Sequence, residues 1–203
     1  MKKGMLIAFE GIDGTGKTSQ LQYLANYLRR KGKEVVETRE PTDGPYGQKI
    51  RALYTSRHTV TMEEELDLFI ADRRQHVAEC IQPALDKGCV VLTDRYYYST
   101  AAYQGALGAD PKSIFQRNAF APRPDLVLLL TMGVDVSLRR IQEQRQEQLN
   151  DFEQAAQLEQ VAALFASFDD PAIVRIEAGG AFAEVQQKIR ETVDRVCAQK
   201  LQS

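Results

Sequence analysis

Near its N-terminus the chain reads Gly11-Ile12-Asp13-Gly14-Thr15-Gly16-Lys17-Thr18, which fits the pattern G-x-x-x-x-G-K-[ST] at every position. The run before it, residues 5–9, is apolar, and residues 19–30 after it carry leucines and an alanine at helical spacing. The stretch therefore lies between a buried strand and a helix, where a phosphate-binding loop is expected.

The chemistry of such a loop explains its residue types. Glycines let the backbone turn tightly and expose N–H groups to an anion, and the helix N-terminus adds a favourable dipole. We predict that Lys17 reaches the β- and γ-phosphates of ATP as a catalytic residue, and that Thr18 places its hydroxyl on Mg²⁺. The predicted ATP-binding residues of the loop are Gly11, Asp13, Gly14, Thr15, Gly16, Lys17, Thr18 and Ser19.

A second apolar run, residues 89–93, ends at Asp94 and Arg95. In enzymes with a phosphate-binding loop, an aspartate at this place holds the Mg²⁺ that the loop hydroxyl also contacts. The arginine beside it could bind a phosphate through two donors. The sequence alone leaves open that Asp94 only caps the next helix.

The whole chain, residues 1–203, is expected to form one domain. Strand candidates at residues 35–38, 89–93, 125–130 and 172–176, most of them apolar runs, alternate with helical patterns. This order predicts an α/β three-layer sandwich of the P-loop NTPase type, with a five-stranded, mostly parallel sheet and helices on both faces. Because ligands bind at the carboxyl ends of such strands, Gly11, Asp94 and Glu177 should face one crevice.

Two local signals refine the helix that follows residue 60. Thr61 with Glu64 three residues later predicts a capping box at its start. Pro83 is expected to kink this helix, and Gly88 to end it.

Composition narrows the range of partners. The formal net charge of −2 argues against a nucleic-acid partner, which would require a basic excess. No apolar stretch is long enough for a membrane span, and the cysteine usage predicts a cytoplasmic protein. Cys80, Cys89 and Cys197 are widely spaced, so we expect reduced thiols and no zinc site.

Several blocks together resemble the thymidylate kinase (dTMP kinase) family, from about Leu6 to about Leu138. They are Phe9-Glu10-Gly11-Ile12-Asp13, Thr38-Arg39-Glu40-Pro41, Leu68-Phe69-Ile70-Ala71-Asp72-Arg73, Asp94-Arg95-Tyr96 with Ser99, Ala102-Tyr103-Gln104, and Arg123-Pro124-Asp125-Leu126. The resemblance implies the reaction ATP + dTMP → ADP + dTDP, with Mg²⁺, small nucleotides as partners and a homodimer.

The resemblance also implies roles for nine residues at the dTMP site. Arg51 and Arg95 would hold the monophosphate, with Arg95 close to the transferred group, and Asp13 would accept from the sugar 3′-OH or orient Arg95. Phe69 would stack on thymine, Arg73 and Gln104 would contact the base, and Pro41 and Ser99 would line the pocket. Tyr103 would lie under the sugar, where a ribose 2′-OH would clash. Each of these residues could instead have a purely structural role; a phenylalanine on an amphipathic helix, such as Phe69, is more often part of a core.

A catalytic arginine is the point at which the chain departs from the family. Members carry it either in the loop, where this chain has Gly14, or in a lid motif, where this chain has Asp151. The lid is expected at about residues 140–152. We hypothesise that Arg145 is the lid arginine, with Arg139 and Arg140 as alternatives. It could equally lie on a solvated face with Glu143 and Glu147.

The adenine contacts are implied only loosely, by the segment Glu177-Ala178-Gly179-Gly180 and by an arginine near Arg140. Because the lid arginine is absent from its usual places, two alternatives to a dTMP kinase remain. The chain could phosphorylate a different nucleoside monophosphate, or it could be a nucleotide-binding regulator without turnover.

Overall fold

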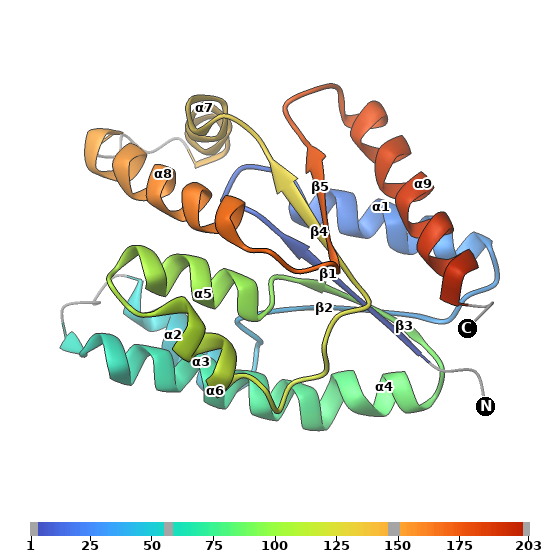
Figure 1. Cartoon of the computed structure of the whole chain (residues 1–203), viewed down its shortest axis with the longest axis horizontal. Coiled ribbons are helices and arrows are strands. Elements are labelled where there is room, and N and C mark those ends of the chain that lie inside the picture. The colour runs from blue at the N-terminus through green and yellow to red at the C-terminus, as the bar shows by residue number, and fades with distance from the viewer. Residues whose placement is uncertain (1–3, 55–58, 146–150, 201–203) are drawn as a thin grey trace.

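A computed structural model of the chain describes residues 4–54, 59–145 and 151–200, without the side chains of residues 144, 145 and 151–154. Figure 1 shows a central sheet with helices on both faces. Its strands are all parallel, in the order β2-β3-β1-β4-β5. They are β1 (Met5–Glu10), β2 (Val35–Arg39), β3 (Val90–Asp94), β4 (Leu126–Thr131) and β5 (Ile173–Glu177). The predicted five-stranded α/β fold is confirmed.

Alternate side chains of the strands enter two separate cores, as the pleat of a strand requires. Ile7 and Phe9 of β1 pack with α1 (Lys17–Arg30) and α9 (Phe182–Lys200) on one face. Leu6 and Ala8 pack on the other face, which is covered by the remaining helices of the core. These include α5 (Tyr97–Ala106), α6 (Pro111–Arg117) and α8 (Asp151–Ser167). Burial on both faces explains why the central strands β1, β3 and β4 read as nearly continuous apolar runs, whereas the edge strands β2 and β5 are more exposed and carry polar residues.

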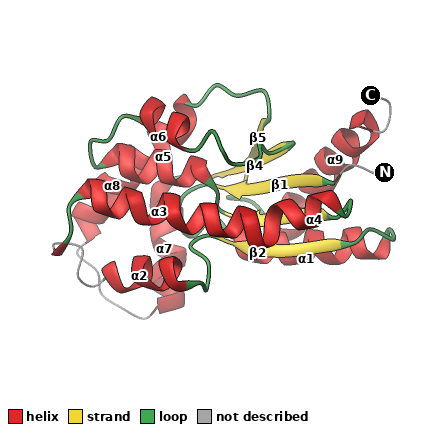
Figure 2. Cartoon of the chain, turned by 90° about the horizontal axis from the view of Figure 1, so that it is seen from below, coloured by secondary structure: helices red, strands yellow, loops and turns green. Residues whose placement is uncertain are grey.

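The helix predicted after residue 60 is a long rod (Figure 2). It consists of α3 (Met62–His76), a π-helical turn η2 (Val77–Ile81) and α4 (Gln82–Asp86). A proline cannot donate to the carbonyl four residues back, and the irregular turn lies just before Pro83. The disturbance expected at Pro83 is therefore found in the preceding turn. Gly88 follows the helix in the left-handed region, with φ of 80°.

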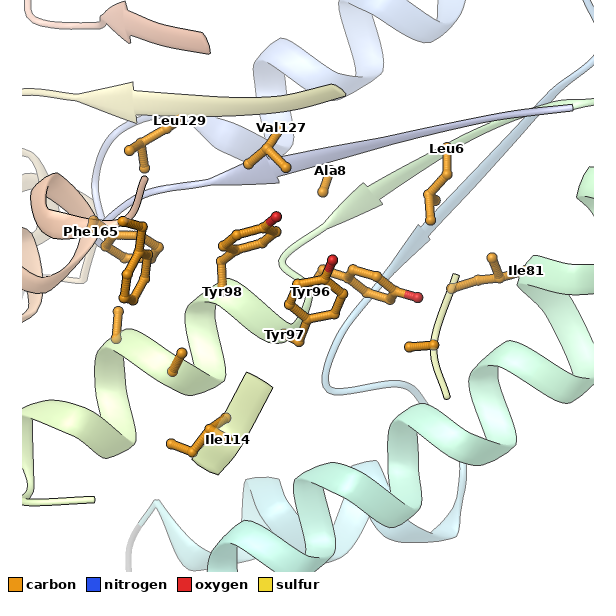
Figure 3. Packing of buried hydrophobic residues seen from close by; sticks show 14 of the residues in the cluster. Leu6, Ala8, Ile81, Tyr96, Tyr97, Tyr98, Ile114, Val127, Leu129 and Phe165 are labelled. Atoms are coloured by element: carbon orange, nitrogen blue, oxygen red, sulfur yellow. The ribbon is translucent and has the colours of Figure 1, made fainter. Parts of the chain in front are cut away.

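Three consecutive tyrosines anchor the start of α5. Tyr96, Tyr97 and Tyr98 are 0%, 9% and 2% exposed and belong to one core cluster. Figure 3 shows them beneath Leu6, Ala8 and Val127 of the sheet. The Tyr96 hydroxyl donates to the Pro122 carbonyl at 3.2 Å and the Tyr98 hydroxyl donates to Asp170 at 2.8 Å. This packing fixes the backbone of Arg95, which directly precedes them.

No helix in the described part of the chain is both long and apolar enough to cross a membrane. Cys80, Cys89 and Cys197 are free thiols, as expected.

The capping box at Thr61 generates a stability prediction. The Thr61 hydroxyl accepts from the Glu64 N–H at 3.2 Å, and the Glu64 carboxylate accepts from the Thr61 N–H at 2.7 Å. Thr61→Ala should lower the free energy of unfolding by about 1 kcal/mol in chemical denaturation, because it leaves helix N–H groups uncapped. Thr61→Asn, which retains a capping oxygen, is the matched control, and equal stability of the two variants would contradict the assignment.

Candidate active site

The carboxyl ends of β1 and β3 lie side by side and bring the phosphate-binding loop next to Asp94. Phe9 pairs with Asp94 across the two strands, and the Thr18 hydroxyl donates to the Asp94 carboxylate at 2.5 Å. Glu177 ends β5 at the same edge, on the far side of β4, where it accepts from the Gly179 N–H at 2.9 Å. The crevice expected from the sequence is therefore built mainly around β1 and β3.

A cavity of about 250 Å³, called here the loop cavity, lies in front of the phosphate-binding loop. It is lined by Asp13, Gly14, Gly16, Lys17, Thr18, Ser19, Asp94, Arg95 and Ile141. Two predicted ATP-binding residues of the loop, Gly11 and Thr15, do not line this cavity. Gly11 is buried beside the Leu130 carbonyl, and Thr15 donates its hydroxyl to the Ile12 carbonyl at 2.9 Å.

Lys17 is held inside the loop. It is 6% exposed, and its Nζ donates to the Ile12 carbonyl at 2.7 Å. Burial, followed by the Arg95 charge, lowers the pKa of Lys17 to about 8, although the carboxylates of Asp13 and Asp94 oppose this. A cation destabilised in this way gains free energy when an anion such as a polyphosphate binds beside it.

Helix α7 (Val134–Arg145) packs directly on the loop, and Gly14 makes this approach possible. The Ser137 hydroxyl donates to the Asp13 carbonyl at 2.5 Å. A Cβ atom at Gly14 would lie 2.7 Å from the Ser137 carbonyl oxygen, and Gly14 has a φ of +77°. The position where other members of the resembled family carry an arginine therefore has no room for a side chain in this chain.

A second cavity of about 350 Å³, called here the aromatic cavity, lies between α3 and α5. Its lining is Asp13, Glu40, Pro41, Tyr54, Phe69, Arg73, Arg95, Tyr96, Ser99, Thr100, Tyr103 and Gln104. Eight of the nine residues predicted for the dTMP site are brought together there. The ninth, Arg51 of α2 (Pro45–Leu53), is not part of the lining and donates to the Pro41 carbonyl at 3.1 Å and to Asp43 at 3.2 Å.

Arg95 lines both cavities and joins them. Its guanidinium donates to Asp13 at 2.7 Å and to the Ser99 hydroxyl at 2.8 Å, and lies 5.0 Å from the centre of the Tyr103 ring. Its φ of 72° is in the left-handed region, which is unfavourable for a residue with a side chain. An outlier held by several contacts at the junction of two cavities is typical of a functional residue.

Glu10 provides much of that support. Its carboxylate is fully buried and accepts from the Tyr96 N–H at 2.9 Å, the Ser99 N–H at 3.1 Å and the Ser99 hydroxyl at 2.5 Å. Glu10 therefore fixes the residue that follows Arg95 and the hydroxyl to which Arg95 donates. Burial raises the pKa of Glu10 from 4.5 to about 7, while the hydrogen bonds from Ser99 and the Arg95 charge act in the opposite direction.

The carboxamide of Gln104 is the clearest sign that the aromatic cavity holds a polar ligand. Gln104 is fully buried, yet among the described residues neither its Nε2 nor its Oε1 has a hydrogen-bond partner. A buried amide without partners is costly. A ligand edge that carries both a donor and an acceptor would satisfy it.

The sequence analysis missed four lining residues: Glu40, Tyr54, Tyr96 and Thr100. Helical spacing could have found Thr100, because it lies four residues before Gln104 on α5. Glu40 belongs to the quoted block that contains Pro41. Tyr54 caps α2 and has no comparable signal in the sequence.

The structure separates the arginines proposed for the lid. Arg139 pairs with Asp135 of its own helix at 2.9 Å, and Arg140 donates to the Ala178 carbonyl after β5 at 3.3 Å. Arg140 therefore lies beside the segment predicted to contact adenine. The Arg145 and Asp151 side chains lie outside the described residues, as does part of the predicted lid, so the Arg145 hypothesis stays a prediction.

Thr18 and Asp94 fit a magnesium ion chemically. A hydroxyl and a carboxylate are hard oxygen ligands, and Mg²⁺ in nucleotide sites takes few protein ligands besides water and phosphate. Within the described ranges, no group of three or more His, Cys, Asp or Glu side chains could hold a metal by itself. The donors present therefore match a metal that arrives with a nucleotide.

The close approach of α7 to Gly14 can be tested with Gly14→Ala, using Gly16→Ala as the matched control. Both glycines have positive φ, but a Cβ at Gly16 would meet nothing within 4 Å. Left-handed strain should cost each variant about 1 kcal/mol, and Gly14→Ala should lose at least about 1 kcal/mol more because α7 must move. Denaturant unfolding measures both, and equal losses would refute the close contact.

Glu10 predicts a specific pH dependence of stability. Between pH 4.5 and about 7 the folded state retains a proton on Glu10 that the unfolded chain releases, so stability falls as the pH rises through this window. At about 1.4 kcal/mol per pKa unit, the loss is about 3 kcal/mol.

Glu10→Gln keeps the shape of the side chain and should remove this component, so its stability relative to wild type should rise from pH 4.5 to pH 8. The exposed Glu159→Gln serves as control. Parallel pH curves for wild type and Glu10→Gln would contradict the prediction.

Comparison with known proteins agrees with this geometry. The sequence model for thymidylate kinase matches residues 9–189. The chain is 56% identical over 186 residues to the thymidylate kinase of Desulfotalea psychrophila, covering 92% of each protein. It is 44% identical over 194 residues to the thymidylate kinase of Akkermansia muciniphila, covering 95% of this chain and 92% of that relative. The chain belongs to the thymidylate kinase family.

Proposed function

We propose that the chain transfers the γ-phosphoryl group of ATP to dTMP, giving dTDP and ADP. One observation carries the proposal: the loop cavity and the aromatic cavity share Asp13 and Arg95. A polyphosphate in the first and a nucleoside monophosphate in the second would meet at the Arg95 guanidinium.

The reaction does not require a strong general base. A phosphate oxygen of dTMP forms the new bond to the γ-phosphorus while the bond to the β–γ bridging oxygen breaks, and ADP leaves. The attacking oxygen is already anionic, so the work is to bring two polyanions together and to neutralise their charge. Lys17 and Arg95, which line the two cavities, supply positive charge, and Asp13 orients Arg95.

Thr18 and Asp94 would hold Mg²⁺ that enters with ATP. When bound, the ion neutralises charge on the phosphate oxygens. The Thr18–Asp94 hydrogen bond holds the Thr18 hydroxyl oxygen next to an Asp94 carboxylate oxygen in the loop cavity.

The aromatic cavity suits thymine and deoxyribose. Phe69 would stack on the base, and Gln104 and Arg73 would meet the donors and acceptors of its edge. Tyr103 would lie under the sugar, and Pro41 and Ser99 would line the pocket. Polar groups held in place inside a cavity give such selectivity because a mismatched base leaves them unpaired.

Membership of the family does not favour the alternatives of another acceptor or of a regulator without turnover. The proposal extends to a single domain, to a cytoplasmic location and to a homodimer with α3 and α5 as candidate interface helices. It also extends to the absence of a nucleic-acid partner, for which the near-neutral charge is the support. Sedimentation of the purified chain tests the assembly.

A coupled assay of ADP release with ATP, Mg²⁺ and each deoxynucleoside monophosphate tests the proposal. Turnover with dTMP should exceed turnover with dCMP at least about hundredfold. Lys17→Ala should abolish it, whereas Lys188→Ala, at an exposed position on α9, should not. Turnover only with a different acceptor would favour another monophosphate kinase, and ATP binding without any turnover would favour a regulator.

A further inference from the structure

Arg73 is embedded in a buried hydrogen-bond network that base recognition alone does not explain. Its side chain is 1% exposed. Nε and Nη2 donate to Glu40 Oε2 at 2.9 and 2.5 Å, Nη2 also donates to the Thr100 hydroxyl at 3.0 Å, and Nη1 donates to Asn118 at 2.6 Å. Among the described residues these bonds occupy four of the five guanidinium N–H groups. The remaining N–H belongs to Nη1, on a residue that lines the aromatic cavity.

Both oxygens of Glu40 have separate partners. Oε2 receives the two bonds from Arg73, and Oε1 lies 2.9 Å from His76 Nδ1. Burial by itself would raise the pKa of Glu40, but the charge of Arg73 and the hydrogen bond from His76 outweigh it and lower the pKa. Glu40 is therefore ionised and can only accept hydrogen bonds.

This fixes the tautomer of His76. Because the carboxylate accepts only, Nδ1 must carry a proton and donate to Glu40. His76 Nε2 lies 2.6 Å from the Thr38 hydroxyl, which can act as donor or acceptor. The chain of bonds thus runs from Thr38 at the end of β2, through His76 and Glu40, to Arg73.

The network determines which edge of the guanidinium is free. With Oε1 held by His76, Glu40 presents Oε2 to the Nε–Nη2 edge of Arg73. The Nη1 side is then left for Asn118 and the cavity. If His76 released Oε1, the carboxylate could rotate and take a different edge, and the free donor would move away from the ligand.

We propose that Glu40 and His76 are positioning residues for base selection, which hold Arg73 so that its free N–H faces the 4-carbonyl of thymine. Cytosine carries an amino group at that position and would set donor against donor. The inference rests on the proposed function, since it takes Arg73 as the group that contacts the base.

The test compares His76→Ala with the matched variant His76→Asn, whose side-chain amide can donate to Glu40 from the position of Nδ1. Steady-state kinetics are measured with dTMP and with dCMP. For His76→Ala, KM for dTMP should rise about tenfold and the dTMP/dCMP ratio of kcat/KM should fall about tenfold, the size of one lost hydrogen bond. KM for ATP should stay within about twofold, and His76→Asn should restore the ratio.

Four results separate the possible failures. If His76→Ala lowers kcat and raises KM for dTMP and for ATP by similar factors, the positioning role is overturned. A lower Tm of this variant with an unchanged dTMP/dCMP ratio of kcat/KM would overturn it as well. Arg73→Lys is the reference: if it keeps the wild-type ratio, Arg73 does not read the base and that part of the proposed function fails. If Arg73→Lys loses the ratio but His76→Ala and Glu40→Gln keep it, only the present inference fails. The His76 pair decides even if Glu40→Gln does not fold.

Discussion

The buried carboxylate of Glu10 holds the site together, because it ties the end of β1 to the start of α5. It accepts from the Tyr96 N–H, next to Arg95 in the chain, and from the N–H and hydroxyl of Ser99, to which Arg95 donates. Arg95 can therefore keep an unfavourable φ of 72° while it donates to Asp13. Glu10 thus supports, together with the Arg95–Asp13 hydrogen bond, the point at which the two cavities meet.

Sequence reasoning succeeded where the signal was local. The three central strands were identified by their apolar runs, because a strand buried on both faces must be largely apolar. The edge strands β2 and β5 carry polar residues, and their weaker signal was an apolar start such as Val35-Val36 in an order that alternates with helices. Lys17, Thr18 and Asp94 follow from motif and strand position. The hydrogen bonds that Glu40, Thr100 and Asn118 make to Arg73 were not predictable, since they join segments 27 to 45 residues apart. Arg73 was expected at the base edge, but its burial in a network could not be read from its own helix.

Gly14 affects the region of the expected lid because it allows α7 to approach the phosphate-binding loop closely. Gly14 lets α7 lie against the loop, where Ser137 bonds to the Asp13 backbone. Residue Arg140 of the same helix reaches the segment after β5, on the side proposed for adenine. In this chain α7 therefore contacts both the loop and the segment after β5, and the charge that a loop arginine would bring must come from elsewhere.

The central claim is that the loop cavity and the aromatic cavity form one continuous site across Arg95. Its most direct test is calorimetric titration with a dinucleotide in which adenosine and thymidine are joined by five phosphates. If the cavities are contiguous, one molecule should bind per chain, at least about a hundredfold more tightly than ATP or dTMP alone, because linking makes the second contact intramolecular. An affinity no better than that of ATP alone would show that the two cavities do not act as one site.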